Sequence, residues 1–301
     1  MSIATLDTLR HVCAMCGGSC QGVNVSLSSQ EELTQVLAQA EQLGISDPAP
    51  EGVLRRVHGR CVFLGDDALC RIHGAWGMSA KPKVCQQYPM IATRVGDETR
   101  VGLDPGCFHS VKSWQTGPEV PGGSLMVSVS KQPEALLPHE ERVMAVLEQA
   151  EGIEQALAML VPGELEGFLG RWIQTLQEVD LAELLADPDT SPSLRVSLGP
   201  LAQTMPGWSA IPGPPELSDN ARAFALHAAK RMVWLRLCPK IPSPAVVALL
   251  SLGGAMACGW TNTDDAAFGQ ALAGWMRAIR APAVLGRLLP SPQSLQTLVE
   301  G

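Results

Sequence analysis

The sequence predicts an α+β protein in which a small cysteine-rich metal-binding domain, with short strands and one helix, precedes an irregular all-α domain. Seven of the nine cysteines lie between residues 13 and 107, whereas apolar residues recur at helical spacing beyond residue 139. Repeated prolines and glycines over residues 115–138 separate these two patterns. We therefore expect a metal-binding domain over residues 1–114, a linker over 115–138 and a helical domain over 139–301.

Composition and charge argue against a nucleic-acid partner. The chain has 301 residues, of which 46% are apolar, and a formal net charge of −8. Residues 1–110 carry 9 basic and 11 acidic side chains, a net charge of −2, and the rest of the chain carries the remaining −6. Neither part offers a basic face for phosphate groups. The N-terminal residues contain no apolar run of the kind found in signal peptides, so we expect a cytoplasmic protein.

One apolar stretch, residues 245–260, resembles a membrane segment in composition. It is 16 residues long, whereas a membrane-spanning helix needs about 20. Its two adjacent glycines suit close packing between helices. We interpret it as a buried core helix and expect no membrane span.

The order of elements before residue 60 can be read from local patterns. Apolar residues alternate with polar ones over 23–27, which predicts a short strand. Ser28 and Glu31 have the spacing of a capping box, which predicts the start of a helix, and Gly44 ends it. The apolar stripe of this helix is Leu33, Val36, Leu37, Ala40 and Leu43.

The C-terminal half shows repeated helical periodicity. Apolar residues at spacings of three and four predict helices within 143–150, 165–176, 219–235 and 268–279, among five to seven in total. Segments rich in proline and glycine connect them. One further strand is predicted over 125–129, inside the linker.

The first group of cysteines has the spacing of a metal-binding loop. Two residues separate Cys13 from Cys16, and three separate Cys16 from Cys20. Two thiolates at the first spacing can chelate one ion in a tight turn. Gly17 and Gly18 allow backbone amides to point at the sulfurs. This geometry occurs both in zinc knuckles and in iron–sulfur loops.

The second group comprises Cys61, Cys70, Cys85 and Cys107. Eight residues separate Cys61 from Cys70, and two short strands joined by a turn at 65–67 would bring their thiols together. The chain from 60 to 109 has little periodicity and cannot build much core alone. A bound metal would supply the missing folding free energy.

Seven clustered thiols exceed the four that one tetrahedral zinc or one cubane cluster requires. Either a second site exists, using a histidine, or some thiols are spare. Four histidines lie within three residues of a cysteine: His11, His58, His73 and His109. We expect each to be hydrogen-bonded or on the surface, with His73 and His109 the better ligand candidates. Cys238 and Cys258 lie in apolar helical patterns and are predicted to be core residues.

The cysteine segments also carry a family resemblance over about residues 10–110. The run Cys16-Gly-Gly-Ser-Cys20-Gln-Gly resembles the CxxCxxCC cysteine-cluster family, which contains YkgJ-type proteins and the flagellin lysine N-methylase. Three later blocks match in order: Cys61-Val-Phe-Leu, Leu69-Cys70-Arg-Ile-His73 and Lys81-Pro82-Lys-Val-Cys85-Gln-Gln-Tyr88-Pro89. The spacer 74–80 and the run Asp104-Pro-Gly-Cys107 resemble the methylase branch. The chain departs from the family at Ser19-Cys20, where the family has paired cysteines.

The resemblance implies that cysteine thiolates chelate zinc or iron. The ligands carried over are Cys13, Cys16, Cys20, Cys61, Cys70 and Cys85, with Cys107 as a further member. Tyr88 is expected to pack its ring over the metal loop. We expect an iron–sulfur cluster slightly more than zinc.

Three functions follow as alternatives. The resemblance to the methylase implies a metal-dependent protein lysine N-methyltransferase that uses S-adenosylmethionine and acts on a flagellin-like protein. However, no glycine-rich loop of the Rossmann type follows a predicted strand. The second alternative is a non-enzymatic structural or interaction module that binds zinc or iron, and the third is an iron–sulfur redox protein. The sequence assigns neither catalytic residues nor an oligomeric state.

Overall fold

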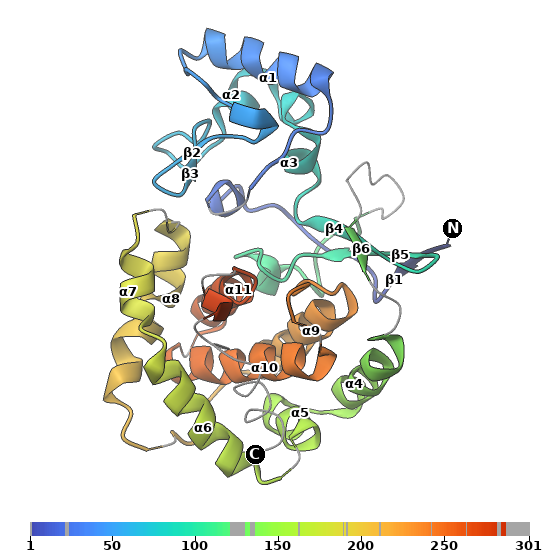
Figure 1. Ribbon diagram of the computed structural model, residues 1–301, viewed down its shortest axis with the longest axis vertical. Helices are drawn as coiled ribbons and strands as arrows, with labels where there is room; N and C mark the ends of the chain where they lie inside the picture. The colour runs from blue at the N-terminus through green and yellow to red at the C-terminus, as the bar shows by residue number, and fades with distance from the viewer. Residues whose placement is uncertain are drawn as a thin grey trace.

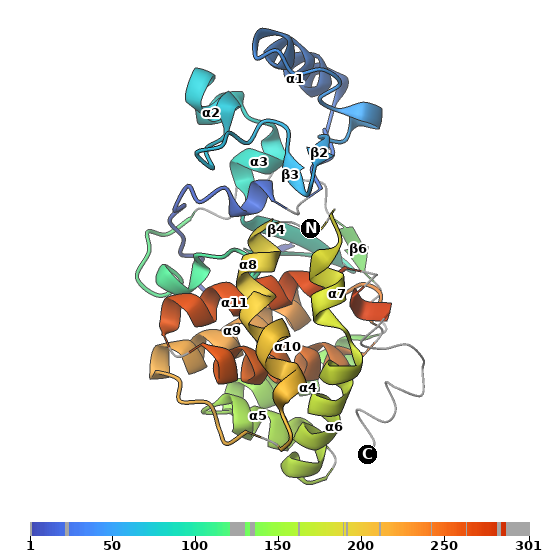
Figure 2. The same ribbon diagram turned by 90° about the vertical axis from the view of Figure 1, so that its left-hand side faces the viewer.

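The computed structural model describes residues 2–21, 24–120, 130–132, 136–161, 163–188, 190, 192–210, 212–241, 243–262, 264–281 and 284–286. It confirms the predicted α+β class, with short strands in the N-terminal part and helices beyond. Figures 1 and 2 show a cysteine-rich lobe (residues 11–89) at one end, a small sheet beneath it and a bundle of helices (the helical part, residues 136–286) at the other end. The strand predicted over 125–129 lies outside the described residues.

The cysteine lobe contains the predicted helix, although it begins one residue later than expected. Its helices are α1 (Gln30–Gln42), α2 (Arg71–Trp76) and α3 (Lys83–Gln87), of which the two short ones were not predicted. Ser29, not Ser28, caps α1 by accepting a hydrogen bond from the Glu32 amide at 3.2 Å. The Glu32 carboxylate accepts from the amides of Ser28 and Lys83, and so ties α1 to α3. Val36 and Ala40 of the predicted stripe are buried.

The strands of the lobe do not form the predicted hairpin. Strand β3 (Arg60–Cys61) pairs with β2 (Arg56–Val57), and the tight turn between them has positive φ at His58 and Gly59. Cys61 and Cys70 are instead brought together by a turn that an isolated bridge between Leu64 and Cys70 closes.

A four-stranded mixed sheet lies between the lobe and the helical part. Its order is β1-β5-β4-β6, with β4 and β5 antiparallel and both edge strands parallel to their neighbours. The strands are β1 (Ser2–Thr5), β4 (Met90–Val95), β5 (Glu98–Leu103) and β6 (Ser130–Gln132). Strand β4 begins five residues after Cys85, and β5 ends four residues before Cys107, so the sheet connects two cysteine segments.

Eight α-helices follow among the described residues, one more than the upper end of the predicted range. They are α4 (Leu137–Gln149), α5 (Ile153–Leu160), α6 (Leu165–Glu178), α7 (Leu181–Ala186), α8 (Pro192–Thr204), α9 (Asp219–Trp234), α10 (Pro244–Thr261) and α11 (Asp265–Ala278). Helix α7 has only six residues, too few for its periodicity to be recognised in the sequence. Helix α10 lies at the centre and contacts α9, α11, α4, α5 and α8.

Helix α10 is apolar on all sides because other helices surround it. It is the one described helix long and apolar enough by composition to cross a membrane, and 78% of that window is buried inside the protein. A side chain at Gly253 or Gly254 would collide with the indoles of Trp172 and Trp275. These indoles donate hydrogen bonds to the carbonyls of Gly253 and Leu250. The paired glycines therefore allow close packing, as their sequence predicted.

A buried ionic network joins the sheet to the helices. Glu140 on α4 accepts hydrogen bonds from Arg100 on β5 and from Arg236, which follows α9, and its side chain is 3% exposed. Arg100 also donates to the Trp234 carbonyl at 2.8 Å. Glu140 is therefore the anion that two buried cations share.

Replacing this anion should destabilise the fold. In a Glu140→Gln variant the two guanidinium groups lose the buried carboxylate that they share, although Arg100 keeps its ion pair with Glu98, and breaking a buried pair typically costs about 3–5 kcal/mol. Urea unfolding followed by circular dichroism measures the change in the free energy of unfolding. The neighbouring Glu141→Gln substitution is the control, because Glu141 is exposed and should change stability by less than about 0.5 kcal/mol. Equal unfolding midpoints for the two variants would contradict this role of Glu140.

Candidate metal centre

All seven clustered cysteines line one cavity of about 620 Å³. They come from the N-terminal loop, β3, the start of α2, α3 and the turn after β5. They are Cys13, Cys16, Cys20, Cys61, Cys70, Cys85 and Cys107. The fold therefore brings together thiols up to 94 positions apart in the chain, the separation of Cys13 from Cys107.

The N-terminal loop presents its thiols through a turn that depends on glycine. Gly17 has φ +65°, in the left-handed region, and a Cβ there would lie 2.5 Å from the Ala68 carbonyl oxygen. The next amide, that of Gly18, points at the Cys16 sulfur at 3.4 Å. The Met15 amide is likewise 3.4 Å from the Cys13 sulfur. Such N–H···S contacts stabilise negative charge on a liganding thiolate.

Electrostatics divides the thiols into two groups. Burial, together with the charges of Cys61 and Cys70, raises the pKa of Cys20 and of Cys85 to about 12, although the charge of Lys81 opposes the shift. Burial, and then the charge of Cys70, also raises the pKa of Cys61, although the Phe63 amide opposes the shift. We call Cys20, Cys61, Cys70 and Cys85, whose charges act on one another, the inner group; Cys16 makes only the smallest contribution to the pKa of Cys20. Cys13, Cys16 and Cys107 form the outer group.

The outer group lies near two histidines. His11 and His109 both line the cavity, and burial lowers the pKa of each, which favours the neutral imidazole that binds metals. The Nδ1 atom of His11 is buried and has no hydrogen-bond partner among the described residues. His73 also lines the cavity, whereas His58 does not. The sequence favoured His73 and His109, but the unpartnered nitrogen makes His11 an equal candidate.

The donor set fits zinc or an iron–sulfur cluster. Thiolates and imidazoles are the ligands of these centres, and no Asp or Glu is among the described residues that line the cavity. Arg56 and Lys81 do line it, and their charges can balance thiolates. Across the described ranges, no three His, Cys, Asp or Glu side chains lie close enough to hold one metal ion, so the thiols are spread over the cavity wall.

Tyr88 and the two remaining cysteines occupy distinct places. Tyr88 lines the cavity, is partly buried, and its hydroxyl accepts a hydrogen bond from Arg277 of α11 at 3.1 Å. Cys238 and Cys258 are buried in the core of the helical part, as their apolar surroundings predicted. No sequence motif pointed to Arg277, because it lies in α11, far along the chain from the cysteine blocks.

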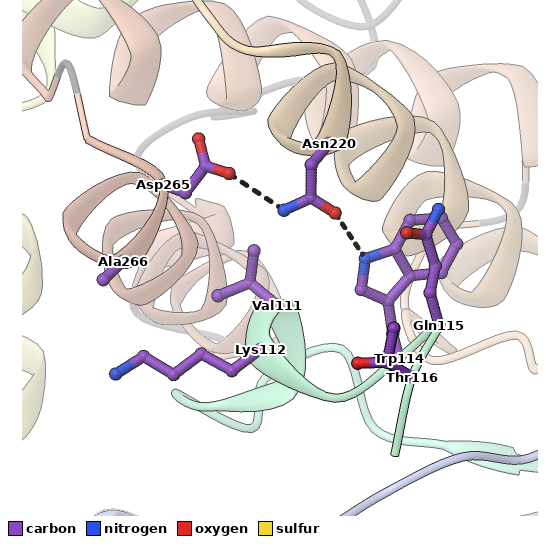
Figure 3. Close-up of a pocket in the computed structure, with 8 residues that line it drawn as sticks. All are labelled: Val111, Lys112, Trp114, Gln115, Thr116, Asn220, Asp265 and Ala266. Carbon is purple, nitrogen blue, oxygen red and sulfur yellow. Dashed lines mark hydrogen bonds between the residues drawn. The ribbon is translucent and has the colours of Figure 1, made fainter.

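A second cavity, of about 350 Å³, lies beside the segment that follows Cys107. Figure 3 shows that Asn220 of α9 bridges the carboxylate of Asp265 and the indole of Trp114. Hydrogen bonds from Ser218 and Asn220 lower the pKa of Asp265. These contacts fasten the segment after Cys107 to the first turns of α9 and α11, and so hold that cysteine segment against the helical part.

Comparison with known proteins supports the metal assignment of the cysteine lobe. Residues 12–107, about a third of the chain, match the family model CxxCxxCC, described as "Putative zinc- or iron-chelating domain". This is the family that the cysteine motifs resemble. The matched range contains all seven clustered cysteines. No curated protein and no solved structure matches the chain significantly.

The glycine turn should be required for metal binding. A Gly17→Ala substitution forces an L-residue into the left-handed region and drives its Cβ against the Ala68 carbonyl, so the loop that carries Cys13, Cys16 and Cys20 must move. We expect metal analysis to show less metal per chain than in the wild-type protein. Gly44→Ala is the matched control, since Gly44 has φ +67° but no atom within 4 Å of the added Cβ. The control should lose about 1–2 kcal/mol of stability and keep its metal. Equal metal content in both variants would show that the turn is not needed.

Proposed function

We propose that the cysteine lobe binds an iron–sulfur cluster of the 4Fe–4S type. The observation that carries this proposal is the convergence of seven thiols on one cavity of about 620 Å³. A single zinc ion would bind four thiols and fill the space between them, so it would account for neither the other three thiols nor the size of the cavity. The inner group supplies the four thiolates that a cubane cluster requires. The proposal also implies a reducing compartment such as the cytoplasm, because all nine cysteines are free thiols.

The spectrum and metal content of the protein test this proposal. Protein purified without oxygen should be brown, with a broad absorption band near roughly 400 nm and about four irons per chain, as a cubane cluster has. Cys70→Ser and Cys85→Ser should each remove most of the iron, because both thiols belong to the inner group. Cys258→Ala should keep it, since this thiol lies in the helical core. A colourless protein with one or two zinc ions per chain would contradict the cluster.

A second function, protein lysine N-methylation, is supported by the size and the rim of the same cavity. The volume of the whole cavity, about 620 Å³, lies within the range of about 300–1,000 Å³ that small-molecule pockets occupy, so a methyl donor such as S-adenosylmethionine would share this cavity with the metal centre. The side chains of Met15, Leu69 and Met78 line the cavity and are also exposed, with 61%, 47% and 41% of their surfaces accessible. An apolar rim of this kind suits a protein substrate, and the family resemblance proposes a flagellin-like one.

Calorimetry with S-adenosylmethionine tests the methylation proposal. The metal-loaded protein should bind the methyl donor, and a Met78→Glu substitution at the rim should leave this binding unchanged while weakening the binding of a protein substrate. If the loaded protein gives no heat of binding, the methylation proposal fails, and the lobe is then a structural or redox centre.

A further inference from the structure

Arg277, near the end of α11, links the helical part to three segments of the candidate metal centre. Its Nη1 donates hydrogen bonds to the carbonyls of Gly18 and Gln21 at 2.8 and 3.1 Å. Its Nε donates to the Gly106 carbonyl at 2.7 Å, and its Nη2 donates to the Tyr88 hydroxyl at 3.1 Å. One guanidinium therefore contacts chain segments that are far apart in the sequence.

Each of these acceptors lies within three residues, along the sequence, of a cysteine that lines the cavity. Gly18 and Gln21 flank Cys20, Gly106 directly precedes Cys107, and Tyr88 follows Cys85 by three residues. The positions of three cysteine segments relative to one another are thus fixed by a side chain that belongs to none of them. A planar group with five N–H donors can satisfy four acceptors in this way, whereas a lysine ammonium has three donors on one atom.

Local packing is arranged around this contact. The guanidinium carbon of Arg277 lies 4.3 Å from the centre of the Phe108 ring, and the same ring closes over Gly18, where a Cβ would come within 2.7 Å of it. A Cβ at Gly106 would come within 2.8 Å of the Arg277 side chain. Glycine at both positions therefore permits the close approach of the arginine and the ring.

A second arginine on the following turn fixes the direction of α11. Arg280 donates to both carboxylate oxygens of Asp104, at 3.2 and 3.0 Å. Asp104 in turn accepts a hydrogen bond from the Gly106 amide at 2.7 Å. The end of α11 and the turn before Cys107 are consequently held as one unit.

We propose that Arg277 is a positioning residue of the metal centre, which makes the centre a site shared between the cysteine lobe and α11. It holds the segments of Cys20, Cys85 and Cys107 in register before metal binds. By linkage, metal binding should then stabilise the end of α11 as much as Arg277 strengthens metal binding. This inference rests on the proposed metal function, which metal binding by the wild-type protein tests separately.

Hydrogen exchange of the metal-free full-length protein tests the positioning role without any metal. In Arg277→Gln, amides of residues 16–21 and 104–108 should exchange at least about tenfold faster than in the wild type, because the carbonyls of Gly18, Gln21 and Gly106 lose the guanidinium that holds these two segments in place. Amides of α9 and α10 should keep their wild-type rates. Arg277→Lys should give an intermediate result, since one ammonium cannot reach all four acceptors. Unchanged exchange in these two segments would overturn the positioning role.

Zinc affinity, measured by competition with a chelator, tests the link to the metal. Arg277→Gln should bind zinc about 10–100-fold more weakly than the wild type, the usual loss when a residue that supports ligands is removed. Glu140→Gln is the matched control, because it weakens the contact between sheet and helices away from the cavity and should keep wild-type affinity. Equal loss in both variants would show that Arg277 acts only through general stability and would overturn the inference. A wild-type protein that binds neither zinc nor iron would instead overturn the proposed metal function, and the exchange data would still decide the role of Arg277.

Discussion

The seven thiols face one cavity, but among the described residues only three of them, Cys61, Cys70 and Cys85, pack against the apolar core of the cysteine lobe. The buried core of the cysteine lobe consists of a few side chains around α1 and the turn before α2: Val25, Val36, Ala40, Ala49, Leu54, Phe63 and Ile72. The loop before Cys20 and the turn before Cys107 lie outside this cluster. Their positions depend on hydrogen bonds and charges, because a short glycine-rich loop cannot bury enough surface to order itself. The rest of the architecture supplies those contacts.

The helical part provides them through the half-buried cations Arg277 and Arg280, while a separate pair of buried cations joins the sheet to the helices away from the cavity. Arg100 and Arg236 meet Glu140 where the sheet packs on the helices, and Arg277 and Arg280 meet carbonyls and Asp104 where α11 reaches the lobe. Groups of this kind are costly to bury unless fully paired, so they specify one arrangement of the parts. The helical part is therefore a scaffold for the cavity, with α10 as its apolar centre.

Much of this organisation could be predicted from the sequence. Periodicity located α1, α6, α9 and α11, and the composition of α10 together with its paired glycines identified a buried helix. Spacing and motif identified the seven cysteines as one constellation. The predictions that were wrong concern pairing. Ser29 caps α1 instead of Ser28, and β3 pairs with β2 instead of forming the hairpin expected between Cys61 and Cys70. Local periodicity cannot choose between such neighbouring partners, because they differ little in energy.

The sequence by itself determined which residues can bind a metal, since cysteine spacing and glycine turns are local properties of the chain. It also determined that a helical region follows, because periodicity is local as well. Only the tertiary structure decided that the thiols form an inner and an outer group, that His11 has a free nitrogen, and that Arg277 spans three cysteine segments. These features join residues up to 259 positions apart, and no local pattern records which distant carbonyl a guanidinium will reach.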